Sequence, residues 1–129
     1  MSPSSLLRGR SALGRRAEDL AAATLEAAGM TLVARNWRRP QGELDLVALT
    51  QDGVCVFCEV RSRTGEASGD PLETVTPQKR AQVIRTARLY LSETEPMRVA
   101  GYRFDVVAVT FYPAPDAPRI VHIEGAFET

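Results

Sequence analysis

The sequence predicts a single α/β domain in which a mixed sheet is flanked by helices. Residues 11–28 and 76–92 have apolar residues at helical spacing, and each segment has recognisable end signals. Apolar, β-branched segments of strand length lie between and after them, and Gln51-Asp52-Gly53 joins two of these as a strong hairpin signal. The resulting order is helix, three strands, helix, two strands, which favours a mixed sheet packed against helices.

The two helices are predicted from their ends and their apolar stripes. The first runs from Ser11 to Ala28, before Gly29 at the C′ position. Its stripe consists of Ala17, Leu20, Ala21, Thr24, Leu25 and Ala28. The second begins at Thr76-Pro77, with Thr as the N-cap and Pro as the first helical residue, and runs to about residue 92. Its expected buried residues are Val83, Ile84, Ala87 and Leu91.

Five strands are expected, separated by segments that contain turn residues. The strands are predicted at 31–35, 43–50, 54–63, 102–111 and 120–123, with Val106, Val107 and Val109 as a buried core in the fourth. Residues 36–42 are expected to form a loop and 113–118 a turn. Residues 64–75 contain Gly65, Gly69 and Pro71, which predicts a mobile loop.

Length and composition are those of one soluble domain. The chain has 129 residues, 44% hydrophobic and 25% charged, so residues 11–129 are expected to form a single domain behind a flexible basic arm at 1–10. No apolar run approaches the ~20 residues of a membrane helix. The N-terminus also lacks the apolar core of a signal peptide, which predicts a cytoplasmic protein without a membrane partner.

Charge is balanced overall but unevenly distributed. The formal net charge is zero, which argues against a strongly basic nucleic-acid-binding domain. Residues 1–42 nevertheless carry seven Arg against three acids, 43–60 carry four acids and no base, and 61–103 carry eight bases against five acids. An acidic centre between basic segments suits a metal site within a phosphate-binding rim. The alternative is an ordinary mixed surface.

The two cysteines, Cys55 and Cys58, are expected to be buried structural thiols. They lie three residues apart on a predicted strand, so their side chains point to opposite faces and are too distant for a disulfide. A zinc or redox site is the less favoured alternative, because the chain has a single histidine.

The predicted hairpin brings two acids together. A three-residue loop places Gly53 in the left-handed conformation and pairs Thr50 with Val54, which puts Asp45 opposite Glu59. Such partners lie ~4.5–5.5 Å apart at Cβ. A two-residue loop would shift the register by one residue and separate the acids.

Two facing carboxylates need a compensating cation. Their repulsion at ~5 Å and an effective dielectric of about 20 is on the order of 3 kcal/mol. A divalent ion such as Mg²⁺ would use both carboxylates and leave positions for water and phosphate. The alternative is a buried ion network in which Arg61, Arg63 or Arg103 neutralises the pair.

Glu18 is the third candidate ligand. It borders the helix stripe that is expected to pack on the sheet, so its carboxylate could reach a metal held by the strands. The alternative is a solvated glutamate at the edge of the helix.

Several spaced motifs resemble the YraN family of bacterial proteins, over residues 14–127. They are Glu18, Gly42-Glu43-Leu44-Asp45, Glu59-Val60-Arg61-Ser62-Arg63, Thr76-Pro77-Gln78-Lys79, Arg103-Phe104-Asp105-Val106-Val107 and Ala126-Phe127. That family resembles the PD-(D/E)xK nuclease superfamily, and is most similar there to archaeal Holliday-junction resolvases. The resemblance implies a restriction-endonuclease-like αβββαβ core, a nuclease site and a homodimer.

The resemblance also implies roles for individual residues. Glu18 matches the acid of the helix, Asp45 the first strand acid and Glu59 the second, and together they would bind Mg²⁺ or Mn²⁺. Arg61 stands where the motif has lysine. Because guanidinium stays protonated, Arg61 cannot act as a base, although it can stabilise charge on a phosphate. Lys79, the only lysine in the chain, either reaches the site from the second helix or is an exposed surface residue.

Other basic residues are candidate nucleic-acid contacts. They are Arg35, Arg38, Arg39 and Arg63, the first three of which surround Trp37. Trp37 either stacks on a base or, as favoured, anchors the core. His122 lies alone in an apolar strand and is expected to be structural.

The sequence therefore predicts metal-assisted hydrolysis of nucleic-acid phosphodiesters, with DNA preferred to RNA and branched DNA among the substrates. One alternative is a nucleic-acid-binding module that has lost turnover through Arg61. The other is a protein-interaction scaffold in which the acids form structural ion pairs.

Overall fold

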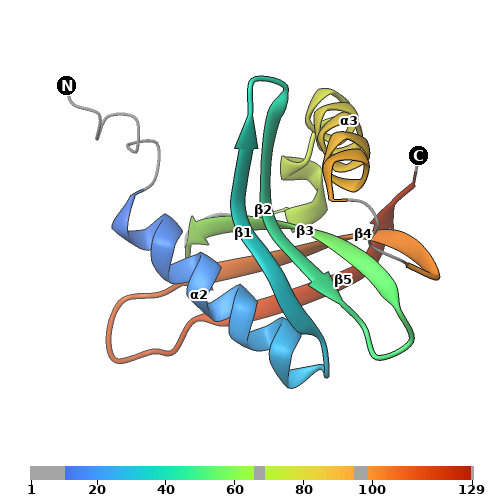
Figure 1. The fold of residues 1–129 in the computed structure, drawn as a ribbon. Helices are drawn as coiled ribbons and strands as arrows, with labels where there is room; N and C mark the ends of the chain where they lie inside the picture. The colour runs from blue at the N-terminus through green and yellow to red at the C-terminus, as the bar shows by residue number, and fades with distance from the viewer. Residues whose placement is uncertain (1–10, 66–68, 95–98, 129) are drawn as a thin grey trace.

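A computed structural model describes residues 11–65, 69–94 and 99–128 of the chain (Figure 1). The elements are α2 (Ala12–Ala27), β1 (Thr31–Arg39), β2 (Gly42–Leu49), β3 (Val54–Thr64), the 3₁₀ turn η1 (Pro71–Thr74), α3 (Pro77–Glu93), β4 (Gly101–Phe111) and β5 (Arg119–Phe127). The predicted order of helices and strands is confirmed, and with it the α/β class and the αβββαβ core of the restriction-endonuclease-like kind. The arm predicted at residues 1–10 lies outside the described residues.

One five-stranded sheet forms the centre of the domain, in the order β1-β2-β3-β4-β5. The β3–β4 pair is parallel and the other three pairs are antiparallel. Parallel neighbours need a crossover connection, and here α3 lies within it, between β3 and β4. The sheet is therefore mixed, as predicted.

The β2–β3 hairpin has the predicted register. Leu46 pairs with Cys58 and Leu49 with Cys55, so paired residue numbers sum to 104. The Thr50 amide donates to the Val54 carbonyl over 2.9 Å, which closes a three-residue loop. Gly53 has φ 88° and occupies the left-handed position that favours glycine. The alternative two-residue loop is excluded.

The helices cover opposite faces of the sheet and define two cores. The α2 core includes Ala21 and Leu25 packed on Leu46 and Val107, all 0% exposed. The α3 core holds stacked aromatic rings, with the Phe57 and Phe104 centroids 5.6 Å apart. Cys58 lies in the first core and Cys55 in the second, and both are free thiols, as the strand alternation predicted.

Helix α3 begins at its predicted cap, and α2 is capped by Ser11, which was predicted as its first residue. The Ser11 hydroxyl accepts from the Gly14 amide over 2.9 Å, and the Thr76 hydroxyl accepts from the Lys79 amide over 3.1 Å. The predicted stripes are partly right, because Ala28 is exposed and the α3 core uses Tyr90 in addition to Val83 and Ala87. Neither described helix is both long and apolar enough to cross a membrane.

Three predicted boundaries were wrong. β1 continues through the predicted loop to Arg39, because Asn36 takes φ 54° and the pairing with β2 resumes after it. The predicted mobile loop at 64–75 contains η1, which the Asp70 side chain caps by accepting from the Leu72 amide over 2.9 Å. β5 is nine residues long, because the β4–β5 pairing continues past an irregularity to Phe127.

Gly42, at the start of β2, is expected to resist substitution because β2 packs closely on α3 there. Its φ is 154°, and a Cβ would lie 2.6 Å from Thr86 Oγ1. Gly42→Ala is therefore expected to lower the free energy of unfolding by about 1–3 kcal/mol, measured by urea denaturation. Gly101→Ala is the control, because nothing lies within 4 Å of the added carbon. Equal stability of the two variants would contradict this packing.

Candidate functional site

The candidate site lies where β2 and β3 separate. The backbone pairing between β2 and β3 ends at Leu46 and Cys58. One residue before Leu46 on β2, the Asp45 side chain accepts a hydrogen bond from β3 in place of a backbone carbonyl. Asp45 Oδ2 accepts a hydrogen bond from the Val60 amide over 2.9 Å. The Asp45 carboxylate is therefore fixed between two diverging strands, next to the segment of β3 that carries Glu59.

Asp45 and Glu59 form a tight pair of acids. Glu59 is 3% exposed, and its carboxyl is hydrogen-bonded to that of Asp45. Burial, followed by the Asp45 charge, raises the pKa of Glu59 to about 8, while Lys79 opposes the shift. Burial also raises the pKa of Asp45, although the Val60 amide opposes that change. At neutral pH the two carboxyl groups therefore share a proton.

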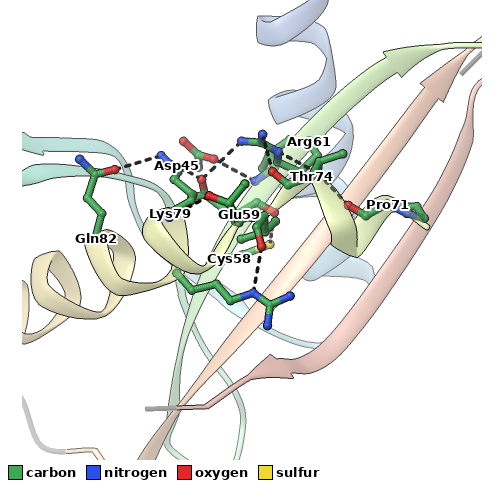
Figure 2. Close-up of polar contacts among 12 residues, drawn as sticks. Asp45, Cys58, Glu59, Arg61, Pro71, Thr74, Lys79 and Gln82 are labelled. Carbon is green, nitrogen blue, oxygen red and sulfur yellow. Dashed lines mark hydrogen bonds and ion pairs between the residues drawn. The ribbon is translucent and has the colours of Figure 1, made fainter. Parts of the chain in front are cut away.

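Lys79 approaches this pair from the first turn of α3 (Figure 2). Its Nζ lies 3.3 Å from Glu59 Oε2 and 3.5 Å from Gln82 Oε1. The ammonium thus points toward the acids, as one of the two sequence interpretations required. The Lys79 ammonium of α3 therefore lies next to the Glu59 carboxyl group of β3.

Arg61 borders the same carboxyl group from the end of β3. Its Nη1 lies 3.9 Å from Glu59 Oε2, farther than Lys79. Two hydrogen bonds to Thr74 of η1 hold the guanidinium, from Nε to Oγ1 at 3.1 Å and from Nη2 to the carbonyl at 3.0 Å. The position expected to hold lysine therefore carries a cation that is anchored away from the acids.

Glu18 does not join the pair as a third ligand. It is 2% exposed, and its Oε1 accepts from Asn36 Nδ2 over 3.1 Å and lies 3.8 Å from Arg35 Nη2. Within residues 11–65, 69–94 and 99–128, no three acidic, histidine or cysteine side chains are grouped as a metal site requires. The three carboxylates are therefore not grouped in this structure, because Glu18 Oε1 is turned to Asn36 and Arg35 on β1, and the metal role of Glu18 stays a prediction.

The remaining pair suits a hard cation. Mg²⁺ is commonly held in enzymes by one or two carboxylates together with phosphate oxygens and water. Asp45 and Glu59 supply such oxygens, and burial together with the Asp45 charge raises the pKa of Glu59, although Lys79 opposes the shift. The two residues therefore fit a divalent metal in donor type and in charge.

The alternative that arginines neutralise the Asp45–Glu59 pair is not supported for Arg63 or Arg103, which have other partners. Arg63 donates to Thr110 Oγ1 over 3.3 Å and to the Gly69 carbonyl over 3.1 Å. Arg103 makes a bidentate ion pair with Asp105 at 2.8 and 3.0 Å. Among the ion pairs of the described residues, Glu59 pairs with Lys79 and, at a greater distance, with Arg61.

A second buried acid, Asp105, has a structural environment. It is 0% exposed and is bonded to Arg103, to His122 Nε2 at 2.8 Å and to the Gly125 amide at 3.0 Å. Although burial alone would raise the pKa of Asp105, hydrogen bonds from His122 and Arg103 hold it below its usual value. His122 therefore joins β5 to β4, in agreement with the structural role expected for it.

The arginines of β1 are engaged with carboxylates. The pairs are Arg35 with Asp19 at 2.7 Å, Arg38 with Glu43 at 3.2 Å, and Arg39 with Glu93 at 2.7 Å. The Arg39 guanidinium also lies 4.1 Å from the centre of the Trp37 ring, whose other contact is the edge of Tyr90 at 5.2 Å. Trp37 thus packs on the α3 core, as the favoured interpretation stated. The predicted role of these arginines in binding nucleic acid stays a prediction.

The sequence analysis missed three residues that position the site. Asn36 holds Glu18, Thr74 anchors Arg61, and Gln82 contacts Lys79. Gln82 follows Lys79 by three residues on a predicted helix, a spacing that could have revealed the contact. The other two contacts depend on the unpredicted extension of β1 and on η1.

The shared proton leads to a spectroscopic prediction. The Glu59 carboxyl carbon, followed by ¹³C NMR, is expected to titrate near pH 8. Lys79→Met should move the transition to higher pH, because it removes the charge that favours ionised Glu59. Lys79→Arg is the matched control and should restore much of the shift.

The free energy of unfolding should depend on the protonation of Glu59. Because the folded-state pKa of about 8 exceeds the ordinary 4.5, the free energy of unfolding should fall as pH rises between these values. Glu59→Gln should flatten this dependence. Titration of Glu59 near its ordinary pKa, with an unchanged pH dependence in Glu59→Gln, would contradict the buried pair.

Comparison with known proteins identifies the family. The model of the uncharacterised protein family UPF0102 matches residues 17–109, which include Glu18, Asp45, Glu59 and Lys79. A UPF0102 protein of Acidothermus cellulolyticus is 47% identical over 128 residues, covering 92% of this chain and 95% of the relative. UPF0102 proteins of Frankia casuarinae and Pseudomonas aeruginosa are 44% and 42% identical, covering 94% and 89% of this chain and 100% and 91% of the relatives. The chain therefore belongs to the UPF0102 family, and the resemblance of its motifs to YraN proteins is confirmed.

Proposed function

We propose that this protein is a metal-dependent nuclease that hydrolyses phosphodiester bonds, with DNA as the expected substrate and Mg²⁺ or Mn²⁺ as the cofactor. The observation that carries the proposal is the pairing of half-buried Asp45 with buried Glu59, with the Lys79 ammonium 3.3 Å from Glu59. Burying two coupled carboxyl groups raises the energy of their ionised forms, a cost that is typical of functional sites.

Asp45 and Glu59 would hold the metal. When bound, such an ion lowers the pKa of a coordinated water and polarises the phosphate. The Val60 amide fixes Asp45 and thereby keeps the two carboxyl groups side by side, so the chain orients the ligands before any substrate arrives. Glu18 would act from farther away, as an orienting group held by Asn36.

Lys79 and Arg61 would act on the phosphate. The Lys79 ammonium has three donors and faces Glu59, so it can hold a phosphate oxygen or an attacking water beside the acids. Arg61 is held by Thr74 and can stabilise negative charge on the phosphate without moving a proton. Lys79 therefore supplies from α3 the lysine that β3 lacks.

A binding module without turnover is the second candidate. It is favoured by Arg61, whose guanidinium is tied to η1 by two hydrogen bonds and stands where the nuclease motif has lysine. In that case nucleic acid would bind with and without divalent metal, and no strand would be cut.

A cleavage assay tests the proposal. Branched, single-stranded and duplex DNA are incubated with the protein and Mn²⁺ or Mg²⁺. Cleavage is expected to fall by about 10²-fold or more in Asp45→Asn and Glu59→Gln, because each removes a charged ligand. Asp52→Asn in the exposed hairpin loop is the control and should cut normally. Full activity in both site variants would exclude this assignment.

Two variants in the same assay separate the roles of the cations. Lys79→Met should reduce the cleavage rate about 10–100-fold while DNA affinity changes little, since it removes one of several cations. Arg61→Lys should retain cleavage. If Lys79→Met cut normally and Arg61→Lys abolished cleavage, the lysine assignment would be wrong.

A further inference from the structure

We infer that the cavity between α2, the end of β3 and η1 binds one unpaired nucleotide of the substrate strand. The inference rests on the proposed nuclease function and specifies its substrate class: nucleic acid with a nucleotide that can leave the duplex. The cavity has a volume of about 310 Å³, and neither Asp45 nor Glu59 is among the described residues that line it.

The size of the cavity suits a single nucleotide. Small-ligand sites begin at roughly 300 Å³, so this volume admits one small organic molecule and excludes a base pair. The wall formed by α2 and β4 contains the small residues Gly14, Ala17 and Ala108, which leave room for a flat ring. Ala17 and Ala108 are also 0% and 3% exposed, so this wall belongs to the packed core.

The cavity is polar and cationic on its other side. Arg61 and Arg63 line it, together with the hydroxyls of Ser62 and Thr74. Arg61 is tied to Thr74, and Arg63 is tied to Thr110 and to the Gly69 carbonyl. Guanidinium groups that are already oriented are suited to phosphate, because little side-chain freedom is lost on binding.

Glu18 adds a hydrogen-bond acceptor to the same cavity. Glu18, which is 2% exposed, is one of the lining residues and follows the small residue Ala17 on α2. A wall with both an acceptor and apolar surface distinguishes a nucleotide from a simple anion. Inorganic phosphate would use the guanidinium side alone.

Arg61 connects the cavity to the candidate site. It lines the cavity, and its Nη1 lies 3.9 Å from Glu59 Oε2. A nucleotide in the cavity would therefore lie beside the phosphate presented to Asp45 and Glu59. Because a base-paired nucleotide cannot enter, this arrangement favours unpaired ends, flaps or branch points over continuous duplex.

Calorimetric titration of the metal-free protein with deoxythymidine and deoxyadenosine 5′-monophosphates tests the inference. Ser62→Glu places a negative charge at an exposed position of the cavity wall and should weaken nucleotide binding tenfold or more. Thr64→Glu is the matched control, because it adds the same charge to an exposed position two residues farther along β3, outside the cavity lining. Thr64→Glu should change the affinity for nucleotide by less than about threefold.

The outcomes separate the two proposals. Nucleotide binding that Ser62→Glu removes and Thr64→Glu preserves supports the cavity, whether or not the protein cuts DNA. Cleavage without nucleotide binding, or equal binding of inorganic phosphate and nucleotide, would overturn the cavity assignment and leave the nuclease proposal standing. Equal effects of Ser62→Glu and Thr64→Glu would also overturn it.

Discussion

The hydrogen bond from the Val60 amide to Asp45 is the interaction on which the candidate site depends. It satisfies a backbone donor that would otherwise pair across the β2–β3 ladder, and it holds a carboxylate where the ladder ends. Glu59, one residue before Val60, is thereby brought against Asp45 and shielded from water by the packed strand. The end of the β2–β3 pairing thus places two acids side by side, with the electrostatic cost that characterises the site.

Three basic residues from different elements compensate the charge of the acid pair to different extents. Lys79 from α3 lies nearest to Glu59, Arg61 is drawn toward η1, and Arg103 is committed to Asp105. Burial and the Asp45 charge raise the pKa of Glu59 to about 8 in spite of Lys79, which favours a protonated pair at neutral pH. This raised pKa is the feature that the proposed metal site would explain, since a divalent cation would stabilise both ionised carboxylates.

The hairpin and both helices could be predicted because their signals are local. Gly53 closes a loop that sets the register, and Thr76-Pro77 starts α3, although the sequence left open whether Lys79 reaches the site or solvent. That register places Asp45 and Glu59 at the next position beyond the last backbone pair, although their contact also depends on the hydrogen bond from Val60. These parts of the fold require no knowledge of distant contacts.

The position of Glu18 could not be predicted in the same way. It depends on how α2 packs across the sheet and on Asn36, whose left-handed conformation lets β1 continue. The anchor of Arg61 likewise depends on η1, a short turn within a segment rich in glycine and proline. Both are tertiary contacts between elements whose relative placement has no periodic signal in the sequence.

Diffraction from crystals soaked in Mn²⁺ tests the central claim most directly, since anomalous scattering locates the ion without any assumption about activity. The account predicts a Mn²⁺ peak within coordination distance of carboxylate oxygens of both Asp45 and Glu59, with Lys79 displaced from Glu59. No peak at the pair at saturating Mn²⁺, with the Lys79–Glu59 contact intact, would contradict it.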